Sequence, residues 1–260
     1  MQDKSVIYHQ DNGVGIITMQ RAKANAYDLA MVTQFGQALQ QAEQDSAVNA
    51  VIVKSGLAKF FCAGADIHAF SQNSTEDNQK MVTQARLNMA TIESSNKIYI
   101  AQIAGHCLGG GVEIALSCDL RFAANGGYLL GLPEIKLGLI PGNGGTQRLV
   151  RLVGLSRALE LLASGDNFNI EQAYHWGIVN RLYSEEELHQ QTFDYALGLS
   201  NGPGLAIAAT KKALREGVEV SLKQGLAIEQ KYVDELYETK DANEGFLAFV
   251  EKRAAKFSGT

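Results

Sequence analysis

Apolar residues form short continuous runs and helically spaced sets that alternate along the first two thirds of the chain. Residues 6–8 and 14–19 are rich in β-forming residues and flank Asp11-Asn12-Gly13, which predicts a β-hairpin. In residues 27–44 apolar side chains recur three or four positions apart, as in an amphipathic helix. Residues 50–53 are a continuous apolar run, typical of a covered strand.

The same alternation continues through the middle of the sequence. We expect further strands at 97–103, 120–124 and 178–183, and helices at 110–117 and 157–176. Strands that alternate with helices in this way predict an α/β fold with a largely parallel sheet.

From about residue 185 only helical spacing is found. We therefore place a soft boundary near residue 200 and expect a core at 1–200 and a helical region at 201–260. In this tail, Asp241-x-x-Glu244 predicts a capping box for a last helix at 242–255.

The helix expected at 221–239 has apolar residues near one face, interrupted by Glu229, which predicts burial against other helices. The apolar residues are Leu222, Leu226, Val233, Leu236 and Tyr237.

The composition of the chain limits the kinds of molecule that it is expected to bind. With 260 residues, 46% apolar and 20% charged, the chain suits one globular domain or a domain with an appendage. A net charge of −5 leaves no basic surplus for phosphate backbones, so we do not expect nucleic acid as a partner. Apolar runs are too short to cross a bilayer, and the first five residues lack the pattern of a signal peptide. We expect a cytoplasmic protein with no membrane partner.

The three cysteines, Cys62, Cys107 and Cys118, are odd in number and form no Cys-x-x-Cys pair. Neither a disulfide framework nor a zinc site is indicated. We expect small buried hydrophobic side chains at these positions and no bound metal.

Eleven of the 26 glycines lie between Gly105 and Gly145. Glycine inside a regular element costs about 0.5 to 1 kcal/mol relative to alanine, so the cluster implies a close backbone approach to something. The segment contains no dinucleotide fingerprint, Walker lysine, Gly-x-Ser-x-Gly elbow or His-Glu-x-x-His helix. These missing motifs argue against a nucleotide-dependent dehydrogenase, a P-loop NTPase, a serine hydrolase and a zincin metalloprotease.

Residues 104–113 join an expected strand to an expected helix. The free N–H groups at such a helix start can hold an oxyanion. Glu113 stands three residues after Gly110, so it shares a helix face with it, about 5 to 6 Å away. Glu134 precedes a second glycine-rich stretch, 139–146. The alternative is that the glycines only serve turns and packing and that both glutamates are solvated.

Four stretches together resemble the crotonase superfamily, and in particular its enoyl-CoA hydratases. They are 61–67 (FCAGADI), 105–113, Pro133-Glu134 with 141–148 (PGNGGTQR), and 244–245 with 249–253. The resemblance implies an α/β fold built as a crotonase-like spiral of ββα units. It also implies a C-terminal helical region that forms homotrimers, commonly paired into hexamers.

The resemblance assigns roles to residues. The backbone N–H groups of Ala65 and Gly110 are expected to hold the thioester oxygen, and Glu113 and Glu134 to act as the acid/base pair. Residues expected along the coenzyme A (CoA) moiety are Lys23, Ala24, Ala26, Ala65, Asp66, Ile67 and His68. Lys23 is the candidate for the CoA phosphates, with a solvated lysine as the alternative. CoA belongs to the substrate, so no separate cofactor is expected.

The chain also departs from the family pattern. Residues 121–132 form a segment one residue longer than in the hydratases, which leaves the loop entering Glu134 open. His106 and Cys107 replace other residues of the pattern. A lone histidine beside a glycine turn is more typical of a structural hydrogen bond than of catalysis, so we expect His106 to be structural.

The expected activity is hydration of a 2-enoyl-CoA to a 3-hydroxyacyl-CoA. Other reactions of the same scaffold stay open: double-bond isomerisation, thioester hydrolysis, decarboxylation and carbon–carbon cleavage. From other classes, a non-catalytic CoA-binding partner in a multienzyme complex and a nucleotide-dependent dehydrogenase remain alternatives. The acyl chain stays open because it depends on how residues 70–89 cover the acyl end.

Overall fold

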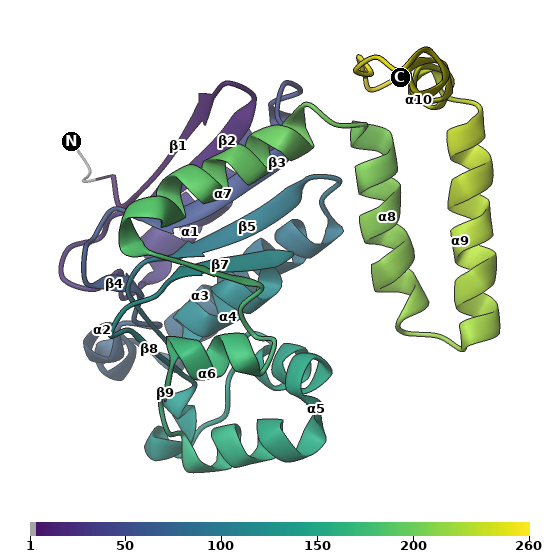
Figure 1. Ribbon diagram of the computed structural model, residues 1–260. Coiled ribbons are helices and arrows are strands. Elements are labelled where there is room, and N and C mark those ends of the chain that lie inside the picture. The colour runs from purple at the N-terminus through teal and green to yellow at the C-terminus, as the bar shows by residue number, and fades with distance from the viewer. Residues whose placement is uncertain (1–3) are drawn as a thin grey trace.

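The larger of two sheets has six strands in the order β1-β2-β3-β5-β7-β10 (Figure 1). Its first two strands form an antiparallel hairpin, and every later pairing is parallel. The strands are β1 (Val6–Asp11), β2 (Val14–Met19), β3 (Ala50–Ser55), β5 (Ile98–Ile103), β7 (Leu120–Ala124) and β10 (Arg181–Tyr183). The predicted hairpin and the largely parallel α/β class are confirmed. This computed structural model describes residues 4–260, so the signal-peptide prediction falls partly outside the described residues.

The smaller sheet has four short strands in the order β4-β6-β8-β9. They are β4 (Phe60–Cys62), β6 (His106–Leu108), β8 (Leu129–Gly131) and β9 (Phe168–Asn169). The pairings β4·β6 and β6·β8 are parallel, and β8·β9 is antiparallel. The sequence pattern did not reveal this sheet, because strands of two or three residues are too short to show alternation.

Helices cover both faces of the larger sheet. The helices before the tail are α1 (Leu29–Gln44), α2 (Ile67–Gln72), α3 (Thr75–Ser94), α4 (Gly110–Ser117), the 3₁₀ turn η1 (Pro133–Leu137), α5 (Gly145–Ser164), α6 (Ile170–His175) and α7 (Glu185–Ser200). Helix α7 covers one face with Leu188 and Ala196. Helices α1, α3 and α4 pack on the other face and enclose the main core.

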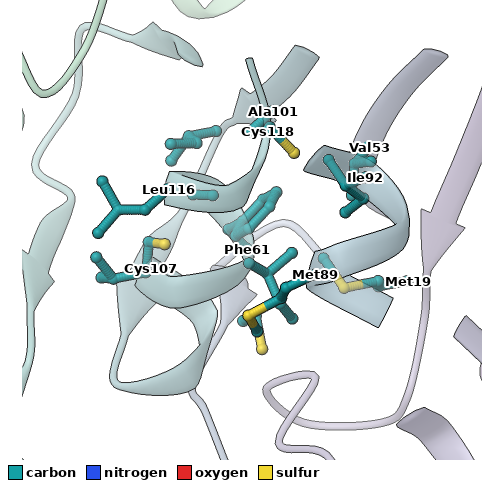
Figure 2. Packing of buried hydrophobic residues seen from close by; sticks show 14 of the residues in the cluster. Met19, Val53, Phe61, Met89, Ile92, Ala101, Cys107, Leu116 and Cys118 are labelled. Atoms are coloured by element: carbon teal, nitrogen blue, oxygen red, sulfur yellow. The ribbon is translucent and has the colours of Figure 1, made fainter. Parts of the chain in front are cut away.

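That main core contains several sulfur atoms. Met19, Met89, Cys107 and Cys118 all belong to this core, which also contains Phe61 (Figure 2). All three cysteines are free and buried, which confirms the expected packing role. No group of three His, Cys, Asp or Glu side chains within residues 4–260 is placed to hold a metal ion.

Several predicted boundaries were wrong for local reasons. Helix α1 begins at Leu29 because Asp28 caps it, accepting a hydrogen bond from Met31 N at 2.8 Å. The helix expected at 157–176 is two helices, since α5 ends at the left-handed Gly165 (φ +64°) and β9 intervenes before α6.

Strand β10 is shorter than the strand predicted at 178–183. The N–H groups of Ile178 and Val179 both donate to Ala173 O at the end of α6, at 2.9 and 3.1 Å, so these residues close the helix instead of joining the sheet. Only Arg181–Tyr183 pairs with β7.

The tail helices α8 (Gly204–Gly217), α9 (Leu222–Tyr237) and α10 (Lys240–Glu251) stand beside the body (Figure 1). The predicted capping box was wrong, because Thr239 caps α10 through Ala242 N at 3.1 Å. Glu244 instead forms an ion pair with Arg253 at 2.6 Å.

The apolar face of α9 is largely uncovered in one chain, with Leu222 79% exposed. The boundary at residue 200 and a role of the tail in assembly stay predictions. No helix among the described residues is long and apolar enough to span a membrane.

Asn25 links three segments from inside the protein. It is fully buried with φ +50°, and its Nδ2 donates to Met19 O, Ser55 Oγ and Phe61 O at 3.2, 2.9 and 3.0 Å. We predict that Asn25→Ala destabilises the protein by about 1 to 3 kcal/mol, because buried acceptors lose their donor.

The matched control is Asn12→Ala, which has φ +48° but lies exposed and bonds only its neighbour Asp11. Both variants replace an asparagine, which tolerates left-handed backbone, by alanine. The difference between their losses of stability therefore reports the contribution of the buried hydrogen bonds. Urea midpoints at one protein concentration measure this difference. Equal shifts for the two variants would contradict the assignment.

Candidate active site

The loops that follow β4, β6 and β8 meet at one edge of the smaller sheet. These neighbouring strands are parallel, so their carboxyl ends point the same way. Ala65 follows β4, Gly110 follows β6, and Glu134 follows β8. Glu113 lies in the first turn of α4, which begins at Gly110. The structure therefore brings the four predicted catalytic residues into one region.

Two backbone donors lie at this edge. Gly64 has φ +85°, and a Cβ placed there would lie 2.9 Å from Gly110 N, so the two loops touch. Gly110 is the first residue of α4 and has no acceptor within the helix. Within residues 4–260 neither the Ala65 N–H nor the Gly110 N–H donates a hydrogen bond. Both groups are free to meet an oxygen atom.

Glu113 is almost completely buried, at 1% exposure. Its Oε1 accepts from Asn143 N at 2.7 Å and from Gly145 N at 2.9 Å, and its Oε2 accepts from Asn143 Nδ2 at 3.0 Å. Burial raises the pKa of Glu113, and the hydrogen bonds from Gly145 and Asn143 oppose that rise. The surrounding donors thus favour an ionised carboxylate in a site that otherwise disfavours charge.

Glu134 has a different environment. It is the second residue of η1, directly after Pro133, and a Cβ at Gly109 would lie 3.3 Å from its Oε1. Its Oε2 is buried and has no hydrogen-bond partner among the described residues. Burial, together with a smaller effect of the negative charge of Glu113, raises the pKa of Glu134 to about 7. This carboxyl can exchange a proton near neutral pH.

The loop entering Glu134 is placed by β8, which lies between β6 and β9. His106 supports it, because its Nδ1 accepts from Leu129 N at 3.1 Å. The expected structural role of His106 agrees with this contact.

The residues expected to meet CoA lie on two adjoining segments. Ala24 O accepts from Ala63 N at 3.0 Å, which holds the segment carrying Lys23, Ala24 and Ala26 beside the loop after β4. Lys23 is exposed, with φ +74°. At the start of α2, Ile67 and His68 are also exposed. The structure brings these residues together, and their contact with CoA stays a prediction.

Arg21 ties these two segments through their carboxylates. Its Nη2 lies 3.1 Å from Asp28 and 2.9 Å from Asp66, and its Nη1 donates to Ala26 O. Asp66 also caps α2 through Ala69 N, and this hydrogen bond together with Arg21 holds its pKa below the usual value. Asp66 therefore has a structural role in fixing the loop that follows β4.

The sequence did not single out Tyr27, Asn143 or Arg148. Tyr27 is 4% exposed, and its hydroxyl accepts from Asn143 Nδ2 at 3.2 Å. A Cβ at Gly110 would collide with this hydroxyl, which explains why Gly110 must be glycine. The only signal for Tyr27 was its place beside the expected CoA segment.

The buried carboxyl of Glu113 and the half-buried carboxyl of Glu134, next to two unpaired backbone N–H groups, define a site for oxyanion chemistry with proton transfer. Comparison with known proteins agrees with this class. The family model described as enoyl-CoA hydratase/isomerase matches residues 9–260. The chain belongs to the enoyl-CoA hydratase/isomerase family, within the crotonase superfamily, and is an enzyme of that family.

Individual relatives match along nearly the whole chain. The chain is 35% identical to 2,3-dehydroadipyl-CoA hydratase of Escherichia coli, over 98% of both chains. It is 34% identical to the short-chain-enoyl-CoA hydratase of Clostridium acetobutylicum, over 97% of both. The crystal structure of an enoyl-CoA hydratase from Bacillus anthracis matches with a TM-score of 0.95 at 33% identity, covering 98% of this chain and 100% of that one.

The raised pKa of Glu134 has a consequence for stability. The folded protein holds a proton on Glu134 up to about pH 7, whereas the free carboxyl loses it near 4.5. The contribution of Glu134 to stability must therefore fall as pH rises from about 4.5 to 7, because this group binds more protons in the folded state in that range. Glu134→Gln cannot ionise and escapes this loss. We predict that its Tm advantage over the wild type grows between pH 5 and pH 8.

Glu186→Gln, at an exposed position in α7, is the control and should show no such growth. Thermal unfolding of the three proteins at both pH values measures the effect. A Glu134→Gln difference that stays constant with pH would show that Glu134 titrates normally.

Proposed function

We propose that this enzyme is a 2-enoyl-CoA hydratase that forms a 3-hydroxyacyl-CoA. The proposal rests on one observation, the pairing of buried Glu113 with half-buried Glu134, whose carboxyls have different hydrogen bonding. Glu113 has three donors and Glu134 Oε2 has none. Groups whose environments differ in this way are suited to divide the roles of base and acid.

The chemistry has two requirements. When water adds at C3, negative charge develops on the thioester oxygen, and the N–H groups of Ala65 and Gly110 would stabilise it. In other enzymes one such donor contributes on the order of 2.7 to 4 kcal/mol. Water must also lose a proton while C2 gains one. Glu113, held as a carboxylate, would take the proton from water, and Glu134, with its pKa of about 7, would deliver one to C2.

Hydration uses both carboxyls, and this separates it from isomerisation. A double-bond shift needs a single carboxylate that takes and returns one proton. The relatives named as hydratases support the same choice, and because their names differ in the acyl group, they do not select an acyl chain for this enzyme. The reaction adds water across the double bond without an oxidant or reductant, so CoA enters as part of the substrate and no separate cofactor is needed. Cytoplasmic location stays a prediction from the sequence.

We predict that Glu113→Gln and Glu134→Gln each lower kcat on crotonyl-CoA by roughly 10² to 10⁴, because glutamine cannot exchange protons. KM should change much less. Loss of absorbance at the enoyl thioester band measures the rate, with a 3-enoyl-CoA isomerisation assay beside it.

Glu171→Gln, at an exposed position in α6, is the matched control. A single variant that keeps more than about a tenth of wild-type hydration rules out the paired mechanism. If only the 3-enoyl substrate is turned over, the proposed activity is isomerisation instead of hydration.

We also propose that the tail helices assemble the enzyme into a trimer or a pair of trimers. Leu222 and Leu226 of α9 and Phe249 and Val250 of α10 are exposed in a single chain. Exposed apolar residues gathered on neighbouring helices are typical of a surface that another subunit covers.

Light scattering should therefore give a mass of three or six chains. Leu222→Glu should lower this mass, because it places a charge in the covered surface. Lys223→Glu, the next residue of α9, changes the charge at an exposed polar position and should leave the mass unchanged. A fully active wild-type monomer would contradict the proposed assembly.

A further inference from the structure

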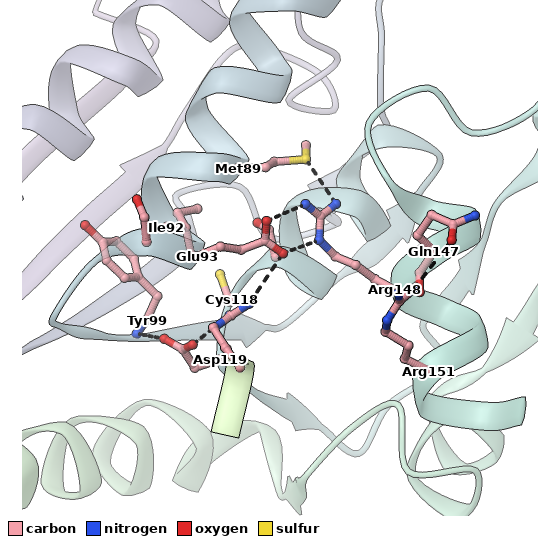
Figure 3. A network of polar contacts seen from close by, with 12 residues as sticks. Met89, Ile92, Glu93, Tyr99, Cys118, Asp119, Gln147, Arg148 and Arg151 are labelled. Atoms are coloured by element: carbon pink, nitrogen blue, oxygen red, sulfur yellow. Dashed lines mark hydrogen bonds and ion pairs between the residues drawn. The ribbon is translucent and has the colours of Figure 1, made fainter. Parts of the chain in front are cut away.

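Arg148 lies directly behind the residues that hold Glu113. Its Nη1 donates to Asn143 O at 2.5 Å. Its Nε and Nη2 donate to the two oxygens of Glu93 on α3, at 2.7 and 2.9 Å (Figure 3). The guanidinium thus joins two elements through a planar fork, which fixes its orientation.

The carbonyl that Arg148 holds belongs to the residue that contacts Glu113 most. Asn143 donates to Glu113 from both its backbone N and its side-chain Nδ2. Gly145 adds a third donor two residues later. Between them, Gly144 has φ +98°, and a Cβ there would collide with Arg148 Nη1. Arg148 therefore packs against the loop that surrounds the Glu113 carboxylate.

We propose that Arg148, anchored by Glu93, is a positioning residue that holds the Asn143 loop and thereby sets the geometry of the Glu113 carboxylate. The inference rests on the proposed role of Glu113 as the base. Arg148 acts in two ways, because it restrains the peptide that supplies the hydrogen bonds and also places a positive charge near the carboxylate.

Electrostatics agree with this arrangement. The charge of Arg148 opposes the burial that raises the pKa of Glu113. The other titratable groups in the site are Glu134, with its pKa of about 7, and Tyr27, whose pKa burial raises well above its usual value. Burial also acts to raise the pKa of Glu93, but Arg148 and Arg215 outweigh it and hold that pKa below the usual value. The anchor of Arg148 is thus a carboxylate.

The anchor also reaches the tail. Arg215 of α8 lies 3.5 Å from Glu93 and 2.9 Å from Asp119. Lys211, one turn earlier, lies 2.8 Å from Asp119. A short chain of ion pairs therefore connects the first tail helix, through Glu93 and Arg148, to the loop around Glu113.

Three substitutions distinguish the effect of Arg148 on the position of the Asn143 loop from the effect of its positive charge. Arg148→Met removes both, so we expect kcat on crotonyl-CoA to fall by about tenfold to a hundredfold, the scale of a misplaced catalytic group. KM should stay within about threefold, because Arg148 is not among the residues expected to meet CoA. The acidic limb of the kcat/KM pH profile should move to higher pH, because a nearby positive charge is lost and the Glu113 pKa rises.

Arg148→Lys keeps the charge, but a lysine cannot make the two-point contact with Glu93 and the hydrogen bond to Asn143 O together. Its kcat should fall while the acidic limb stays closer to that of the wild type. Glu93→Gln keeps Arg148 but loses its charged anchor, so its kcat loss should be smaller than that of Arg148→Met.

Arg151→Met is the matched control, since Arg151 lies one turn further along α5 and forms an exposed pair with Glu219 at 3.2 Å. Its kcat and pH profile should remain within about twofold of the wild type, as expected when an exposed ion pair is removed. Thermal unfolding and light scattering confirm that each variant is folded and assembled.

The inference is overturned if Arg148→Met behaves like Arg151→Met. It is also overturned if Arg148→Met loses activity with an unmoved acidic limb, because that pattern indicates a purely structural role. If the wild type is active, Glu113→Gln is inactive and Arg148→Met is normal, then only this inference fails and the proposed function stands. A wild type without hydratase activity, or an active Glu113→Gln variant, defeats the proposed function and this inference with it.

Discussion

Burial of the Glu113 carboxylate is the constraint on which the site depends. A charge this deeply buried is unfavourable unless hydrogen bonds replace the lost water. The Asn143 loop supplies three of them, from two backbone N–H groups and one side-chain amide. Tyr27 accepts from the same amide, so the Asn143 side chain is fixed between a carboxylate and a hydroxyl. The glycines of this loop and of the α4 start allow the close contacts that such a site requires.

The two sheets have separate tasks in building this site. The six-stranded sheet carries the core, with helices on both faces. The four-stranded sheet adds Phe61, Cys107 and Leu130 to that core, and its parallel strands β4, β6 and β8 deliver three loops to one edge. The unpaired N–H groups of Ala65 and Gly110 and the carboxyl of Glu134 come from those loops. Short strands are sufficient for this purpose, because they need only set the direction of the chain.

The sequence predicted the elements with strong periodicity. The hairpin, the central strands and α4 lay close to their expected places, because runs of apolar residues and helical spacing are local signals. Glu113 and Gly110 could be linked in advance by their spacing in one helix turn. Glu134 and Ala65 needed the family resemblance, since loops that meet at a sheet edge leave no spacing pattern. Glu93, which contacts a residue 55 positions away in sequence, could not be inferred at all.

The central claim is that Glu113 and Glu134 act as one unit, in which Glu113 takes a proton from water and Glu134 delivers one to C2. A double-mutant cycle on kcat for crotonyl-CoA tests it most directly, using Glu113→Gln, Glu134→Gln and the double variant. Groups that act together lose their function when either is removed, so the second loss should add little. The account predicts a double variant whose rate is close to that of the slower single variant. Losses that multiply to the full product of the two single effects would contradict it.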